Sequence, residues 1–106
     1  MEITDAKWAK LSWIYKGDFY LYENAHQSLE SNEETKAIRF KLIETTGKES
    51  DHFEFVIRQD KNDFFFKADC FKEHDVESPL KLFRSNDEVV LYFEDDLGHG
   101  FFRLGE

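Results

Sequence analysis

Residues 87–104, DEVVLYFEDDLGHGFFRL, are the stretch that decides the expected fold of this chain. They have the pattern of a complete β-hairpin, with a strand, a glycine-rich turn and a returning strand. Val89, Leu91 and Phe93 alternate with Glu88 and Glu94, and a strand points successive side chains to opposite faces. The hairpin should therefore have one face in the core and one in solvent. The residues expected to be buried are Val89, Leu91, Phe93 and Leu104, whereas Tyr92 and Phe101 should not be buried.

The turn of this hairpin sets its register. Placing Gly98-His99 in the turn brings Phe93 opposite Leu104 on the inner face. It also brings Glu94 opposite Arg103 on the outer face, where the two would form an ion pair. Arg103 would then neutralise Glu94, and the strongest negative charge would lie at the turn.

The rest of the chain shows the same alternation between turn signals about 8–12 residues apart, which is typical of antiparallel sandwiches and barrels. No repeat, linker or low-complexity segment divides the 106 residues. We predict one all-β domain over residues 1–106, with seven to eight antiparallel strands built from consecutive hairpins. The pattern leaves open whether these form a sandwich or a small barrel, and in which order. The other expected strands are residues 11–15, 19–23, 36–44, 53–58, 64–71 and 80–84, with Leu80 and Leu82 facing inward.

Two segments depart from this alternation. Thr4 is a candidate N-cap for a short helix over residues 5–10, which would dock on the body through Trp8. Residues 24–35 are the most polar part of the chain and are expected to form a solvated loop.

The first hairpin carries an aromatic ladder. A type II′ turn at Gly17-Asp18 would place Ile14 opposite Leu21 on one face. On the other face, Trp13 would lie opposite Tyr22, and Tyr15 opposite Tyr20. This ladder could be part of the core, or it could line a ligand pocket inside a barrel.

Charge and cysteine usage limit the function. The chain has 23 acidic and 14 basic residues, a formal net charge of −9. This charge argues against binding to nucleic acid or to an anionic membrane, and it favours a basic partner. Cys70 is the only cysteine, so no internal disulfide can form and a reducing compartment fits. The first residues lack the features of a signal peptide, and we expect a cytoplasmic protein.

No motif indicates catalysis. The chain lacks a phosphate-binding glycine loop, a nucleophile elbow and a dinucleotide fingerprint. Cys70 continues an apolar strand face, which favours a buried thiol over a nucleophile. Histidines and acids gather at residues 73–75 and 95–99, but without a known ligand spacing. We therefore predict no enzyme, no metal and no cofactor.

The outer face of residues 87–104 is the candidate site. Phe101 would lie opposite Asp96 and near Tyr92, and interfaces use such aromatic anchors with charges at their edge. We expect a non-catalytic immunity protein or inhibitor that covers the positively charged site of a basic protein such as a nuclease toxin. Its carboxylates would replace substrate phosphates, with Tyr92 or Phe101 as the anchor. The candidate partner-binding residues are Glu88, Tyr92, Glu94, Asp95, Asp96 and Phe101.

Three alternatives remain open. A nucleic-acid mimic that inhibits a defence enzyme is a related possibility. A barrel that carries a small ligand would use the aromatic ladder and would need an apolar cavity of several hundred Å³. An accessory or structural subunit would have its acidity only incidentally.

Overall fold

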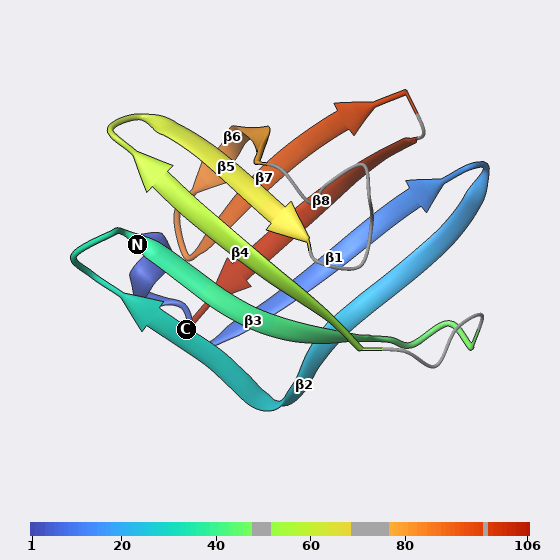
Figure 1. Ribbon diagram of the computed structural model, residues 1–106, viewed down its shortest axis with the longest axis horizontal. Helices are drawn as coiled ribbons and strands as arrows, with labels where there is room; N and C mark the ends of the chain where they lie inside the picture. The colour runs from blue at the N-terminus through green and yellow to red at the C-terminus, as the bar shows by residue number, and fades with distance from the viewer. Residues whose placement is uncertain (48–51, 69–76, 97) are drawn as a thin grey trace.

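The protein is an antiparallel β-barrel. The computed structural model describes residues 1–47, 52–68, 77–96 and 98–106. In this part of the chain each strand pairs with its neighbours in sequence, and the last strand pairs with the first to close the barrel (Figure 1). The all-β prediction is confirmed, in its barrel form. The elements are a 3-10 turn η1 (Ile3–Asp5) and the strands β1 (Trp8–Tyr15), β2 (Asp18–Asn32), β3 (Ala37–Glu44), β4 (His52–Asp60), β5 (Asp63–Ala68), β6 (Ser78–Ser85), β7 (Glu88–Asp95) and β8 (Gly98–Gly105).

Strand β3 shows how the sequence specifies the two sides of the barrel wall. Its apolar residues Ile38, Phe40 and Leu42 are buried, whereas Arg39 and Lys41 between them are exposed. Burying the side chains at the inner positions removes apolar surface from water. This burial stabilises the fold by roughly 1.5–3 kcal/mol for each large side chain. The strand predicted over residues 36–44 is therefore confirmed.

A cluster of phenylalanine rings fills the middle of the barrel around Phe102. The Phe102 ring centroid lies 5.2 Å from that of Phe66, 5.5 Å from Phe55 and 5.7 Å from Phe93. Phe40 lies 6.2 Å from Phe102 and is stacked on the Phe55 ring at 5.8 Å. The rings of Phe40, Phe55 and Phe66 meet Phe102 edge to face, a favourable aromatic geometry, so side chains from five strands pack at this level.

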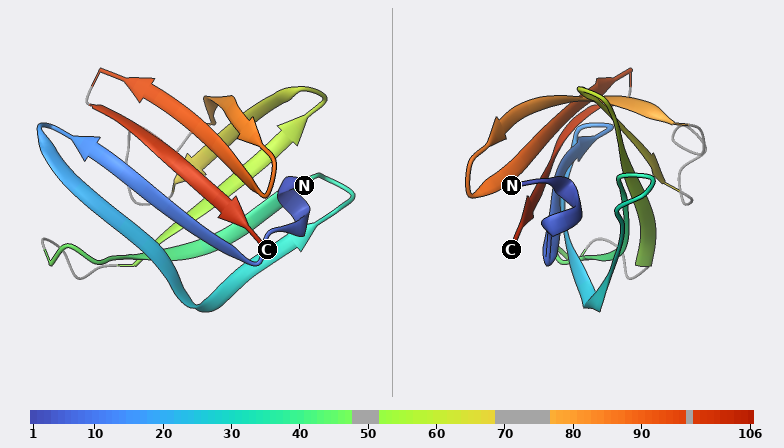
Figure 2. Two further views of the ribbon diagram at one scale, coloured as in Figure 1. Left: turned by 180° about the vertical axis from the view of Figure 1, so that it is seen from behind. Right: turned by 90° about the vertical axis from the view of Figure 1, so that its left-hand side faces the viewer.

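The N-terminal segment turns across one end of the barrel (Figure 2, right). Ile3 of η1 and Ala6 after it are buried there. The helix predicted over residues 5–10 is wrong, because β1 begins at Trp8 and pairs with Gly105 of β8. The Lys7 backbone N–H donates to the Gly105 carbonyl at 2.6 Å. Strand β8 thus supplies the hydrogen bonds that a helix would have made internally.

Strand β2 extends well beyond its expected end. The loop predicted over residues 24–35 is wrong, since β2 continues to Asn32 as a partner of β3. The register shifts between Asn24 and Leu29, and the ribbon bends sharply in this strand (Figure 1). Backbone pairing with β3 holds this polar stretch extended. Such hydrogen bonds between strands do not require alternating apolar side chains.

The β1–β2 hairpin turns one residue earlier than predicted. Tyr15 pairs with Asp18, so the turn residues are Lys16 and Gly17, both with positive φ (51° and 84°). Positive φ at both positions is the conformation of a type I′ turn. The predicted type II′ turn at Gly17-Asp18 is therefore wrong, and each partner shifts by two residues.

The aromatic ladder nevertheless faces inward. Trp13 pairs with Tyr20, and Tyr22 with Leu11. Because the shift is even, no side chain changes face. Trp13 and Tyr22 are buried, and Trp13 lies 5.9 Å from the Phe93 ring. Tyr15 and Tyr20 are half-buried and pack against the core. The described contacts make the ladder part of the core.

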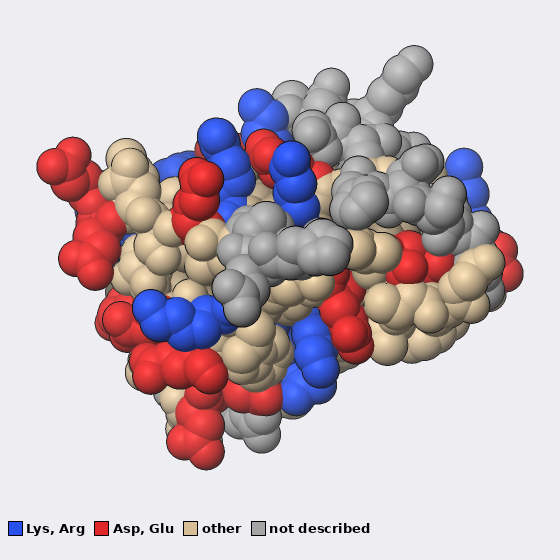
Figure 3. Space-filling view, turned by 90° about the horizontal axis from the view of Figure 1, so that it is seen from below, with Lys and Arg blue, Asp and Glu red and all other residues tan. Residues whose placement is uncertain are grey.

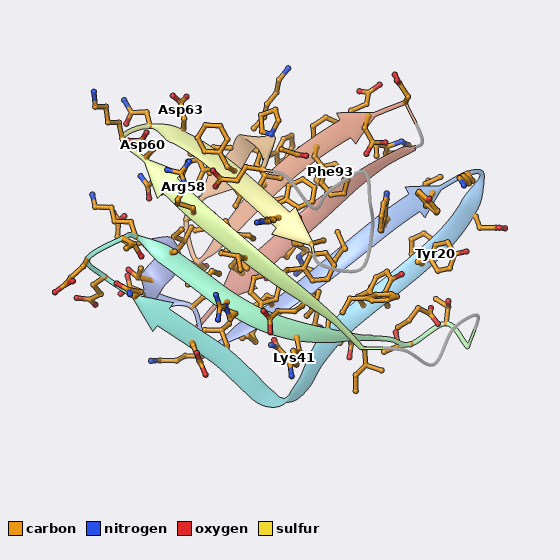
Figure 4. The ribbon with its side chains drawn as sticks, viewed as in Figure 1. Tyr20, Lys41, Arg58, Asp60, Asp63 and Phe93 are labelled. Atoms are coloured by element: carbon orange, nitrogen blue, oxygen red, sulfur yellow. The ribbon has the colours of Figure 1, made fainter. Side chains whose placement is uncertain are left out.

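An ion pair between Arg58 and Glu77, which we call the clip, lies on the barrel wall where β5 meets β6. Arg58 of β4 donates two hydrogen bonds to Glu77, at 2.7 and 2.9 Å, and its guanidinium lies 4.9 Å from the Phe65 ring centroid. Asp60 is at the end of the same strand, beside Arg58 (Figure 4). Register pairs join β5 to β6 at three positions in the described part of the chain, one of them Pro79, which has no N–H to donate. The clip therefore reinforces a short ladder.

Glu77→Gln should lower the urea midpoint slightly at neutral pH. The hydrogen bonds from Arg58 lower the pKa of Glu77. A carboxylate with a lowered folded-state pKa stabilises the fold above its unfolded pKa, and this contribution is lost as the pH falls through the folded pKa. The difference between wild type and variant should therefore vanish in acid. Urea midpoints across a pH series test this, with exposed Glu33→Gln as the control. A difference that is constant with pH would contradict the clip.

Candidate partner-binding face

The β7–β8 hairpin has the predicted faces but a different register. Phe93 pairs with Gly100 rather than Leu104, and Glu94 pairs with His99 rather than Arg103. The predicted pairs are therefore wrong by four residues, and Gly98 and His99, the predicted turn residues, lie in β8. The even shift preserves the faces, and the predicted burial is confirmed. Val89, Leu91, Phe93 and Leu104 are buried, and Tyr92 and Phe101 are half-buried.

Close packing keeps two glycines in β8 and out of the turn. A Cβ atom on Gly100 would lie 2.8 Å from the Phe93 ring and 2.9 Å from the Ser12 carbonyl oxygen. A Cβ on Gly98 would lie 1.8 Å from the Ile14 carbonyl oxygen. The glycines read as turn residues thus allow β8 to lie between β7 and β1.

The shifted register changes the ion pairs of the face. Arg103 donates to Glu88 at 2.8 and 3.2 Å, and these hydrogen bonds raise the pKa of Arg103. Glu94 accepts a 2.7 Å hydrogen bond from the Tyr92 hydroxyl, which raises the pKa of Tyr92. The predicted neutralisation of Glu94 by Arg103 is therefore wrong. Glu94 is exposed and makes no ion pair with the described residues.

The two aspartates at the end of the hairpin differ. Asp95 is half-buried, and its Oδ1 accepts the Gly98 backbone N–H at 2.9 Å, which ties the hairpin end together. Asp96 is exposed. Among the six predicted residues, the structure places Tyr92, Glu94 and Phe101 together on the outer face. Glu88 forms an ion pair with Arg103, and Asp95 accepts a hydrogen bond within the hairpin end.

Two residues of β6 enlarge this face and were not predicted. Leu82 was expected inside but is 47% exposed, and Phe83 is 73% exposed. The β6–β7 register shifts between Leu82 and Arg84, so β6 loses its alternation there. The adjacent apolar pair Leu82-Phe83 was the available signal, because both residues cannot face inward in a regular strand.

These side chains enclose a surface groove. Phe83 lies 6.1 Å from Phe101, and Phe101 lies 5.1 Å from Tyr92, between ring centroids. The groove has a volume of about 350 Å³. We call it the aromatic groove, and it is lined by Lys81, Leu82, Phe83, Tyr92 and Phe101.

Charged side chains also occur away from the β6–β8 face. Acidic and basic side chains are mixed over the face seen from below (Figure 3). A second exposed apolar pair, Ile14 and Phe19, lies on β1 and β2. The aromatic groove combines the exposed ring of Phe83 and the half-buried rings of Tyr92 and Phe101 with the nearby carboxylate of Glu94, which makes no ion pair with the described residues.

Other predicted chemistry falls partly outside the described ranges. Cys70 and residues 73–75 lie there. Among the described residues, no three acidic, histidine or cysteine side chains gather in a group that could hold a metal. No described helix is long and apolar enough to cross a membrane.

No protein-family model, curated protein or solved structure matches this chain.

Proposed function

We propose that the protein is a non-catalytic binding protein whose β6–β8 face holds a basic protein partner. One observation carries this proposal: the aromatic groove is open to solvent beside the charged side chain of Glu94. Aromatic residues are enriched among the anchors of protein interfaces. Covering exposed apolar surface is favourable by roughly 25 cal/mol per Å², so a partner seated on Phe83 would gain from burying it.

The core beneath supports the face as a rigid platform. Tyr92 follows Leu91, and Phe101 precedes Phe102, on strands whose inner side chains are fully buried. The outer rings therefore stand on backbone fixed by the core. A binding surface that is already ordered loses less conformational entropy on association.

The charge favours a basic protein over a second copy of this chain. Two copies would each carry a net charge of −9, and like charges disfavour association. A basic partner would instead be attracted, and its cations would find Glu94 and Asp96 available. The concrete form of the proposal is an immunity protein or inhibitor that covers the positively charged site of a nuclease toxin in the cytoplasm.

Reversing two charges tests the proposal. A partner captured from the native host should be basic, and its binding should weaken steeply with salt. Glu94→Lys with Asp96→Lys should slow association with this partner by about tenfold or more, because steering depends on local charge. The matched control is Glu33→Lys with Glu34→Lys in the β2–β3 turn, which changes the net charge equally.

Three outcomes would contradict the proposal. Equal effects of the two double variants would show that only the overall charge matters. The proposed recognition would also be ruled out if the captured partner were acidic. The same would hold if its association rate were insensitive both to salt and to the Glu94–Asp96 reversal. Stopped-flow kinetics at several salt concentrations distinguish these cases.

A further inference from the structure

We infer that the face recognises a pair of neighbouring side chains, with an apolar side chain in the aromatic groove and a Lys or Arg on Glu94. This inference rests on the proposed function and specifies the partner's chemistry at that site. It follows from the shape of the groove, the free acceptor capacity of Glu94 and the position of Lys81.

The groove matches an apolar side chain. The ring planes of Phe83 and Phe101 are inclined at 77°, and those of Phe101 and Tyr92 at 49°. The inclined rings and Leu82 present apolar walls rather than a flat surface. A volume of about 350 Å³ is at the lower end of the range for small-molecule sites, which suits one or two inserted side chains rather than a whole helix.

Glu94 provides the polar half of the site. A carboxylate offers about four acceptor positions, and the Tyr92 hydroxyl occupies one of them. The remaining positions are available to a cation, since Glu94 is exposed and makes no ion pair within the described ranges. A guanidinium or ammonium group bound there could also lie against the Tyr92 ring, a favourable cation–π arrangement.

Lys81 gives the site a direction. It pairs with Tyr92 across the β6–β7 ladder and lines the groove. Its positive charge disfavours a second cation on the β6 side. Glu94 lies two residues along β7 from Tyr92, so the partner's cation should bind at that end of the groove. This placement of opposite charges favours one orientation of the bound pair.

A random peptide library tests the inference without a known partner. Phage-displayed peptides of about twelve residues would be selected on the wild-type protein and measured by fluorescence polarisation. We expect enrichment of an apolar residue close to a Lys or Arg. Phe83→Ala should weaken the selected peptides by about tenfold or more, within the range for interface anchors. Phe19→Ala, at the exposed apolar pair on β2, should leave their affinity unchanged.

A double-mutant cycle then isolates the cation. Glu94→Gln should weaken a selected peptide, and replacing the peptide's basic residue by Gln should weaken it similarly. If the two groups interact, the second change should have little further effect on the Glu94→Gln protein. Circular dichroism would confirm that each variant is folded, as expected for exposed positions.

The outcomes separate the inference from the proposed function. Two results would overturn the inference and leave the face as the binding surface. The selected peptides could require Phe83 but lack a basic residue, or their affinity could be unchanged by Glu94→Gln. Binding insensitive to both Phe83→Ala and Phe101→Ala would overturn the face itself, as would the absence of any enriched peptide. Self-association in sedimentation experiments that Phe83→Ala abolishes would identify a second copy as the occupant and overturn both.

Discussion

Replacing Phe102 by alanine should lower the free energy of unfolding by about 3–5 kcal/mol, the usual cost of removing a fully buried aromatic ring. Phe102 is fully buried and lies at the centre of the ring cluster. Its removal would leave a cavity that Phe55, Phe66 and Phe93 cannot fill together, because each is fixed to a different strand. The total free energy of unfolding of a small domain is about 5–15 kcal/mol, so this loss would be a large fraction of it. Urea denaturation measures it directly.

The matched control for Phe102→Ala is Phe19→Ala. Phe19 is 47% exposed on the outside of β2, and exposed substitutions usually change stability by less than about 0.5 kcal/mol. Equal losses in the two variants would show that the described core does not account for the stability of the barrel.

Adding a single methyl group in Gly100→Ala should cost about 1–3 kcal/mol, the usual range for overpacking. The new Cβ would meet the Phe93 ring at 2.8 Å and the Ser12 carbonyl oxygen at 2.9 Å. Phe93 cannot easily move, because its ring packs on Trp13 and Phe66. The carbonyl belongs to the backbone of β1, so the strand itself would have to shift. Chemical denaturation again provides the measurement.

His99→Ala is the control for Gly100→Ala. His99 is the exposed neighbour on β8, and its truncation should be nearly neutral. Alanine restricts the unfolded chain more than glycine, which by itself stabilises a protein by about 0.4–1 kcal/mol. A Gly100→Ala variant more stable than wild type would therefore show that β1 and Phe93 yield freely and that close approach does not explain this glycine.

In the β7–β8 hairpin, the alternation of apolar residues was sufficient to predict the faces, whereas in β6 it wrongly placed Leu82 inside. Leu91 and Phe93 are buried, and Tyr92 between them is not. This result is insensitive to register, because a shift by an even number of residues returns every side chain to the same face. Both hairpins for which a register was predicted shifted by an even number, so their faces survived.

Register was harder to predict because turn signals and packing signals use the same residues. Gly98 resembles a turn residue, yet it is needed in β8 for close approach to Ile14. Lys16 has no special turn preference, yet it adopts a positive φ beside Gly17. The position of Gly98 depends on β1, which is far away in the sequence, so a local pattern could not predict it.

The candidate site was predicted in part for the same reason. Tyr92, Glu94 and Phe101 share the outer face, as expected from alternation. The ion pairs followed the register, so Arg103 pairs with Glu88, and Glu94 makes no ion pair with the described residues. The exposure of Phe83 arises from a register irregularity within β6. In the sequence, only the adjacency of Leu82 and Phe83 indicated this irregularity.

The closing ladder between β8 and β1 has a consequence for synthesis of the chain. The other described ladders join strands that are adjacent in sequence, so they can form as successive hairpins emerge from the ribosome. The barrel, however, can close only after its last strand is made. Until then β1 and β7 have unpaired edges and the phenylalanine-rich inner surface is open, both of which promote aggregation. Docking of β8 is therefore the step that removes both unpaired edges and closes the inner surface.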